Sequence, residues 1–262
     1  MNMVVCIKQV PDTAEVKIDK ETNTLIREGV PAIINPFDLH GIEEAVRLRS
    51  DHGGTVTVIT MGPPQAEEAL KESIALGADA VLHLCDKAFA GADTWATSYT
   101  LAAAIRKMEA VDIIICGRQA IDGDTAQVGP GIAEHMGIPH ITNVRSVKLL
   151  ENSHFQFERM TDDGFEVLEV AAPVLITVVR EINQPRMPSL KGMMKAKKAS
   201  IPVMNHHDLQ LAQETIGLQG SPTWVTKVFS PELPEAAGEM FEGSSEECAD
   251  KLMDLFSRFK IV

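Results

Sequence analysis

The middle of this chain reads Ile113-Ile-Ile-Cys-Gly-Arg-Gln-Ala-Ile-Asp-Gly-Asp-Thr-Ala-Gln-Val-Gly-Pro130, followed by Gly131-Ile-Ala-Glu-His-Met136. An apolar run, a loop of small and polar residues and an amphipathic run predict a buried strand, a turn and a helix. Asp124 or Thr125 would cap that helix, with Pro130 in its first turns. Such a junction directs free backbone N–H groups and the positive helix end beyond the sheet, where they favour phosphate.

Two interpretations of this loop stay open from its spacing. An ordinary strand-to-helix loop has a similar composition to an anion-binding one. The chain also lacks both Gly-x-Gly-x-x-Gly and the P-loop Gly-Lys-Ser/Thr. A nucleotide bound here would therefore be held by a scheme other than the standard dinucleotide and NTPase fingerprints.

The same alternation of strand and helix signals recurs along residues 1–143. Buried strands are predicted at 4–7, 56–61, 80–85 and 112–116, and helices at 66–76 and 95–108. Asn35-Pro-Phe-Asp38 opens a further helix, with Asn35 as N-cap, Pro36 in the first position and Asp38 as the third capping residue. This order predicts an α/β fold of the Rossmann-like, adenine-nucleotide-binding kind, a parallel twisted sheet with helices on both faces.

Several polar loops follow the carboxyl ends of these strands. Ligands of parallel α/β sheets bind beyond that edge, so convergence of several loops there favours nucleotide binding more than any single loop does. The loops are 8–11, 61–63, 91–94 and 117–128.

Beyond residue 143 the pattern changes to short runs with tight turns. The runs 144–149, 155–160, 167–170 and 174–179 predict meandering antiparallel strands that extend or flank the parallel sheet. A small hairpin is predicted at 16–18 and 25–27. Residues 202–246 resemble an extended arm, and a helix is expected at 247–259. We therefore expect a nucleotide-binding domain over 1–200 and, over 201–262, a C-terminal arm and helix that pack on a partner subunit.

Composition excludes several classes of function. The chain has 262 residues and a formal net charge of −13, which argues against nucleic-acid binding. It has no apolar run of membrane-spanning length and no signal-peptide layout, so a cytoplasmic protein away from membranes is expected. Its four cysteines are dispersed without a Cys-x-x-Cys, so no metal site is indicated.

One basic segment contrasts with this acidic composition. Residues 182–201 contain no acidic residue, although they hold five cations, three methionines and one leucine: Arg186, Lys191, Lys195, Lys197, Lys198, Met187, Met193, Met194 and Leu190. A solvated loop is the plain interpretation. Cations around flexible apolar groups, on backbone made irregular by Pro185, Pro188 and Gly192, also suit transient docking on an acidic protein. No aromatic residue interleaves for base stacking on nucleic acid.

Four motifs, in order, resemble the electron-transfer flavoprotein beta subunit. They are Asn35-Pro-Phe-Asp38 with the following Glu43-Glu-Ala-Val-Arg-Leu48, Ile59-Thr-Met-Gly-Pro63, Gly117-Arg-Gln-Ala-Ile-Asp122, and Pro185-Arg-Met-Pro-Ser-Leu-Lys-Gly-Met-Met-Lys-Ala-Lys-Lys198. The resemblance runs over essentially the whole chain. It implies a heterodimer with an alpha subunit, an adenine-nucleotide site in this chain, and a redox FAD held mainly by the alpha subunit.

The resemblance also implies site residues. The cofactor contacts would come from Cys6, Asn35, Pro36, Phe37, Asp38, Met61, Gly117, Arg118, Gln119, Ala120, Ile121, Asp122, Gly123, Asp124, Thr125, Ala126, Gln127 and Val128. Leu190 would be the anchor that enters a partner dehydrogenase, with Lys191, Met194, Lys195 and Lys197 around it. No side chain is expected to act as a general acid, base or nucleophile.

The segment after Ile121 departs from ordinary members, which bind AMP there. Asp122-Gly-Asp-Thr-Ala-Gln-Val-Gly-Pro130 is similar to the electron-bifurcating members, as is Lys8-Gln-Val-Pro-Asp-Thr13. In those members the site holds a second FAD, and Gly123 and Ala126 are small enough to admit a larger ligand. The resemblance implies NADH as electron donor, with ferredoxin or flavodoxin and an acyl-CoA dehydrogenase or enoyl-CoA reductase as acceptors. The alternatives are a non-bifurcating subunit with structural AMP and a non-redox nucleotide-binding module.

Overall fold

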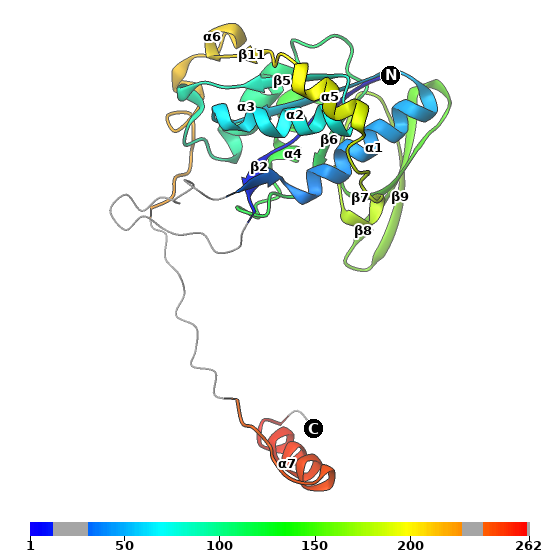
Figure 1. The fold of residues 1–262 in the computed structure, drawn as a ribbon, viewed down its shortest axis with the longest axis vertical. Coiled ribbons are helices and arrows are strands. Elements are labelled where there is room, and N and C mark those ends of the chain that lie inside the picture. Colours follow the sequence, from blue (N-terminus) through cyan, green and yellow to red (C-terminus); the bar gives the residue numbers. More distant parts are fainter. Residues whose placement is uncertain (13–30, 227–237, 261–262) are drawn as a thin grey trace. The chain divides into compact units, whose positions relative to one another are not determined.

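The computed structural model of the chain describes residues 1–12, 31–226 and 238–260 (Figure 1). The hairpin predicted at 16–18 and 25–27 lies outside the described residues. The chain divides into two compact units, Met1–Thr226 and Lys227–Val262. No helix among the described residues is long and apolar enough to cross a membrane.

A nine-stranded sheet forms the centre of the first unit, in the order β11-β5-β4-β1-β6-β10-β7-β8-β9. The first seven strands of that order run parallel, and β7, β8 and β9 are antiparallel to one another. The predicted α/β fold is thereby confirmed. The parallel part comprises β1 (Asn2–Cys6), β4 (Thr55–Met61), β5 (Ala80–Leu84), β6 (Ile113–Gly117), β10 (Val174–Val178) and β11 (Val203–Met204), followed by β7 (His140–Leu149).

Helices cover the sheet and create a hydrophobic core on each face. Successive strand residues point to opposite faces, so Val4 belongs to one core and Val5 to the other. The helices are α1 (Pro36–His52) and α2 (Glu67–Leu76) over one core, and α3 (Thr94–Ile105) and α4 (Val128–Met136) over the other. Burial on both faces explains why the central strands are continuous apolar runs.

The run 174–179, predicted as the last strand of the antiparallel meander, forms β10 in the parallel part of the sheet instead. Strands β7, β8 (His154–Thr161) and β9 (Gly164–Ala171) form the meander, but β10 returns to lie parallel between β6 and β7. All five residues of β10 are buried. The expectation of a fourth antiparallel strand was therefore wrong, because this unbroken apolar run suits a central strand rather than a half-exposed edge.

A separate two-stranded ribbon connects β1 to α1. Its strands, β2 (Gln9–Pro11) and β3 (Ala32–Ile34), are antiparallel and pair Gln9 with Ile34. Short 3-10 helices occupy Pro64–Ala66, Lys87–Phe89, Glu151–Ser153, Arg180–Ile182 and Gln213–Thr215.

The segment interpreted as a basic loop contains a helix, α5 (Leu190–Lys198). The Ser189 hydroxyl accepts a hydrogen bond from the Gly192 N–H, at 3.0 Å, and so caps the helix. The expectation of irregular backbone was correct only before Ser189. Pro188 precedes the helix instead of interrupting it, and Gly192 allows close packing on α2.

The chain after residue 200 contributes to both units. Strand β11 pairs with β5, the short α6 (His206–Leu209) follows it, and the first unit continues to Thr226. The predicted boundary at residue 200 falls before these elements. In the second unit, α7 (Ser245–Arg258) occupies the region where a helix was expected. It begins with a capping box in which Ser244 and Glu247 satisfy each other's backbone N–H groups.

Candidate functional site

A cleft lies at the carboxyl edge of the sheet, where the loops after β1, β4 and β6 meet. Its lining combines residues that follow β1, residues that follow β4, and Asp122 from the loop after β6: Lys8, Gln9, Val10, Pro11, Ala32, Met61, Gly62, Pro63, Gln65, Ala66 and Asp122. Parallel strands end at one edge, which is why segments more than a hundred residues apart line one cleft.

Asp38 connects two of these loops from beneath. Its carboxylate accepts hydrogen bonds from the backbone N–H of Lys8, at 2.7 Å, from the backbone N–H of Gly117, and from the Asn35 amide, at 2.9 Å. Burial raises the pKa of Asp38 to about 7, against the lowering effect of these three donors. Asp38 therefore positions the loops after β1 and β6.

Asn35 occupies the predicted N-cap position of α1, but its side chain does not cap the helix. Its amide nitrogen donates to the Gln119 carbonyl at 2.8 Å, and its amide oxygen accepts from the Ile121 N–H at 3.1 Å. The predicted side-chain capping was wrong, because the loop after β6 takes the acceptor oxygen and Asp38 is engaged with Lys8 and Gly117. The start of α1 thus holds residues 119–121 in place.

Gly117 passes too close to the start of α1 for any side chain. A Cβ atom there would lie 2.2 Å from Asp38 Oδ1 and 2.8 Å from Phe37 Cβ. At Gly123, by contrast, a Cβ atom would meet nothing within 4 Å. The loop is therefore clamped at its start and surrounded by free space at its middle.

An ion pair joins the two loops above Asp38. The Lys8 ammonium lies 2.6 Å from Asp122 Oδ1, and the Asp122 side chain is only 10% exposed. Lys8 and Gln9 were not among the predicted cofactor residues, although the loop at 8–11 was expected at this edge. Their position directly after β1, at the carboxyl edge of the sheet, could have identified them as site residues from the sequence.

The N-terminus of α4 carries no side-chain cap. Gln127 is its N-cap residue, and neither Asp124 nor Thr125 caps it as predicted. The Asp124 carboxylate instead accepts from the Gln119 amide at 2.7 Å, and Gln127 Oε1 accepts from the Thr94 hydroxyl at 3.1 Å. First-turn N–H groups without a side-chain cap favour a negatively charged group at the end of this loop.

Cys6 and Cys116 lie side by side below the cleft. They are paired in register on β1 and β6, both are free thiols, and they are 7% and 6% exposed. The neighbouring Cys6 thiol, together with burial, raises the pKa of the Cys116 thiol. The two side chains pack in the core under α3 and α4 as small apolar groups.

The structure brings several of the expected cofactor residues to this edge, while Arg118 lines a separate pocket with Asn143 and Arg159. Met61 and Asp122 line the cleft, and Asn35 and Asp38 lie under its loops. The Phe37 ring instead packs beneath the Arg180 guanidinium, 4.9 Å from its centroid.

The expected docking residues lie on α5, away from this cleft's lining. Leu190 is 73% exposed and Met194 55% exposed, one helical turn apart. Their face is opposite Gly192 and the buried Ala196, which face α2; a Cβ atom on Gly192 would lie 2.3 Å from the Ala75 carbonyl oxygen. The Lys195 ammonium donates to the Ala78 carbonyl at 3.2 Å, so this lysine is engaged by the chain's own backbone.

The amino-acid sequence was compared with those of known proteins, and it matches one family over most of its length. Residues 22–209 match the electron transfer flavoprotein domain. The chain is 52% identical to the electron transfer flavoprotein subunit beta of Thermoanaerobacterium thermosaccharolyticum, over 97% of each chain. It is 48% identical, over 100% of each chain, to the caffeyl-CoA reductase-Etf complex subunit CarD of Acetobacterium woodii. It is 42% identical to protein FixA of Azorhizobium caulinodans, over 98% of this chain and 95% of FixA.

Proposed function

This chain belongs to the electron transfer flavoprotein family as a beta subunit, and from that premise we propose that it binds FAD at the carboxyl edge of its sheet. With an alpha subunit, it would take electrons from NADH and divide them between two acceptors. One acceptor would be ferredoxin or flavodoxin, and the other an acyl-CoA dehydrogenase-type protein that reduces an enoyl-CoA.

The observation that carries this proposal is the loop between β6 and α4. It is clamped at Gly117, has free space around Gly123 and ends at an uncapped helix N-terminus. These features fit a nucleotide whose phosphates contact backbone N–H groups and whose bulk extends past the loop. The resemblance of residues 122–130 to electron-bifurcating members supports the choice of FAD over AMP. Similarity to CarD, which is named as a subunit of a caffeyl-CoA reductase-Etf complex, supports a reductase of CoA esters as the acceptor.

The proposed contacts are the residues that the resemblance implied: Cys6, 35–38, Met61 and 117–128. Asp38 and Asn35 would act beneath the ligand, by fixing the loops. The N–H groups at the start of α4 would hold phosphate oxygens. When bound, the flavin supplies hydride acceptance and single-electron release. This chain would bind the flavin, orient it and limit its contact with water.

The exposed face of α5 would bind the dehydrogenase, so that electrons can pass from the flavin to this partner. Leu190 offers the apolar anchor, and Lys191 and Lys197 surround it with positive charge. Methionines such as Met187 and Met194 adapt to different surfaces because their side chains are unbranched and flexible. We also propose that α7 packs on the alpha subunit, since Leu252 and Met253 are exposed on it and Phe259 is exposed directly after it.

Cofactor content tests the proposal directly. The chain is co-produced with its alpha subunit, and the nucleotides released by denaturation are counted by chromatography. We expect two FAD per pair and bleaching of flavin absorbance by NADH. One FAD with one AMP would instead establish the non-bifurcating carrier, and a pair without flavin would leave a non-redox nucleotide-binding module.

A further inference from the structure

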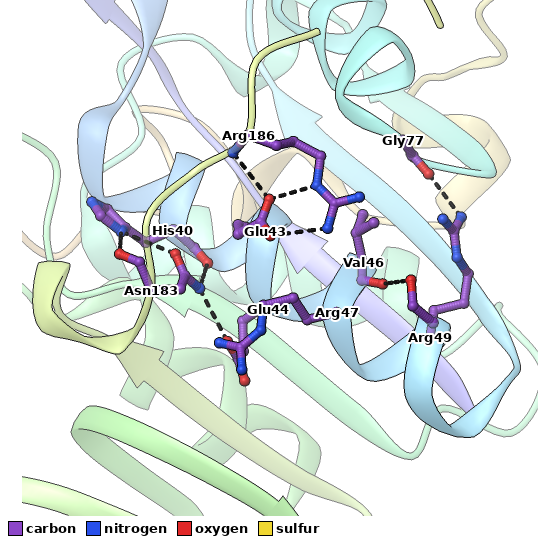
Figure 2. A network of polar contacts seen from close by, with 10 residues as sticks. His40, Glu43, Glu44, Val46, Arg47, Arg49, Gly77, Asn183 and Arg186 are labelled. Carbon is purple, nitrogen blue, oxygen red and sulfur yellow. Dashed lines mark hydrogen bonds and ion pairs between the residues drawn. The ribbon is translucent and has the colours of Figure 1, made fainter. Parts of the chain in front are cut away.

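We propose that Arg186 is a positioning residue that orients α5 for docking, through a clasp on helix α1. The clasp consists of His40, Glu43 and Glu44 on α1 together with Asn183 and Arg186 of the segment that leads into α5 (Figure 2). This inference rests on the proposed docking role of α5. It adds that the docking surface is oriented by the same helix whose first turn organises the nucleotide cleft.

The first half of the clasp is a bidentate ion pair. The Arg186 guanidinium donates through Nε to Glu43 Oε2 at 2.7 Å and through Nη2 to Glu43 Oε1 at 2.9 Å. The Arg186 backbone N–H also donates to Oε2, at 3.1 Å. One nearly buried carboxylate, with a side chain 8% exposed, therefore fixes both the backbone and the side chain of Arg186. The hydrogen bonds that Arg186 donates to Glu43 raise the pKa of Arg186.

The second half of the clasp is made by Asn183. Its amide nitrogen donates to the His40 carbonyl and to Glu44 Oε2, each at 3.0 Å. The His40 ring nitrogen Nδ1 lies 3.1 Å from the Asn183 carbonyl oxygen. Burial raises the pKa of Glu44, while its hydrogen bond from Asn183 acts in the opposite direction. Figure 2 shows these contacts arising from neighbouring residues of α1, within about one helical turn.

Helix α5 has a second, independent attachment within the helix itself, on the C-terminal side of Leu190. Gly192 approaches the Ala75 carbonyl of α2 too closely for a side chain, and Lys195 donates to the carbonyls of Ala78 and Asp79 at 3.2 and 3.4 Å. Residues 187–190 lie between the two attachments. Met187 is 86% exposed there, and Leu190 is 73% exposed. The direction of these apolar side chains is therefore determined by both attachments together.

The Arg186–Glu43 pair is better suited to fixing the orientation of the segment before α5 than to stabilising its attachment. The ion pair itself adds little net stability, because the nearly buried Glu43 carboxylate loses hydration while the Arg186 side chain, 41% exposed, keeps much of its own. A planar guanidinium on a carboxylate does fix an angle, since two parallel hydrogen bonds permit one relative orientation. Lysine would keep the charge but lose that geometry.

The test uses the pair of this chain with its alpha subunit and an acyl-CoA dehydrogenase titrated as electron acceptor. For Arg186→Lys we expect the KM for the dehydrogenase to rise about tenfold, equivalent to about 1.4 kcal/mol. The kcat and the nucleotide content should stay unchanged. Glu43→Gln should have a similar effect, and the double variant should be no worse than either single variant. Hydrogen exchange of residues 187–190 should become faster in both.

Arg145→Lys is the matched control, because Arg145 pairs with Glu158 at 3.3 Å on the antiparallel strands. It should leave the KM and the exchange of α5 unchanged. Leu190→Ala separates the two proposals. If Leu190→Ala raises the KM and Arg186→Lys does not, the clasp has no role in orientation although docking stands. If neither variant changes the KM, α5 does not dock and the clasp proposal fails with it.

Discussion

Asp38 shows how one residue can depend on the fold for its properties. The residue lies in the first turn of α1, yet its carboxylate joins the loops after β1 and β6. Burial is the largest influence on it and raises its pKa to about 7. In the unfolded chain an aspartate titrates near 3.9.

This difference predicts a pH dependence of stability. Between about pH 4 and pH 7 the folded state holds a proton on Asp38 that the unfolded state has lost, so the free energy of unfolding should fall as pH rises through this window. The slope contributed by one such group is at most about 1.4 kcal/mol per pH unit. Denaturant unfolding at pH 5 and pH 7 measures the effect. Asp38→Asn should remove this component of the slope, and an identical pH dependence in the variant would contradict the assignment.

Gly117 gives a second prediction at the scale of the residue. Gly117→Ala should destabilise the protein by about 1–3 kcal/mol and weaken nucleotide binding, because the new Cβ would overlap Asp38 and Phe37. Gly123→Ala in the same loop is the matched control for stability, since its Cβ would meet no protein atom within 4 Å. Chemical unfolding and nucleotide retention measure both variants. Equal stability of the two variants would show that the approach at Gly117 is not tight.

At the scale of the element, α5 and β10 show where sequence patterns are ambiguous. The prolines and glycine of residues 185–192 indicate irregular backbone, but Ser189 caps a helix directly after Pro188. The run 174–179 follows three antiparallel strands in sequence, yet β10 lies between β6 and β7. In both cases local chemistry was compatible with two structures, and packing against α2 or against the central strands selected one.

Helix α1 contacts both the loops of the cleft and the segment that leads into α5. Its N-cap residue Asn35 and its first-turn residue Asp38 hold the cleft loops, and its following turn holds Asn183 and Arg186. The placement of α5 is therefore linked to the placement of the cleft by one helix.

At the scale of the whole molecule, the charge distribution is uneven. The chain carries a formal net charge of −13, while α5 has Lys191, Lys195, Lys197 and Lys198 without an acidic residue. Net charge alone would repel an acidic partner. Attraction to such a partner therefore depends on this local cluster.

The uneven distribution predicts how electron delivery depends on salt. Delivery to the dehydrogenase should slow as ionic strength rises, since exposed charges are screened over about 8–10 Å at physiological salt. Neutralising Lys191 and Lys197 to glutamine should lower the rate at low salt and flatten the salt dependence. Lys148→Gln, on β7, serves as the control. Stopped-flow rates at several salt concentrations provide the measurement, and an unchanged salt dependence in the double variant would show that these lysines do not guide docking.

The sequence by itself determined the parallel α/β class, the edge where loops converge and the family resemblance, because these depend on local periodicity and on motifs read in order. The tertiary structure alone decided the place of β10, the use of Asn35 and Asp38 as links between loops, and the clasp of Arg186 on Glu43. Those features are contacts between residues about 30 to 143 positions apart. Such partners are chosen only when the sheet and its helices bring them together, since each polar side chain has several possible partners and burial selects among them.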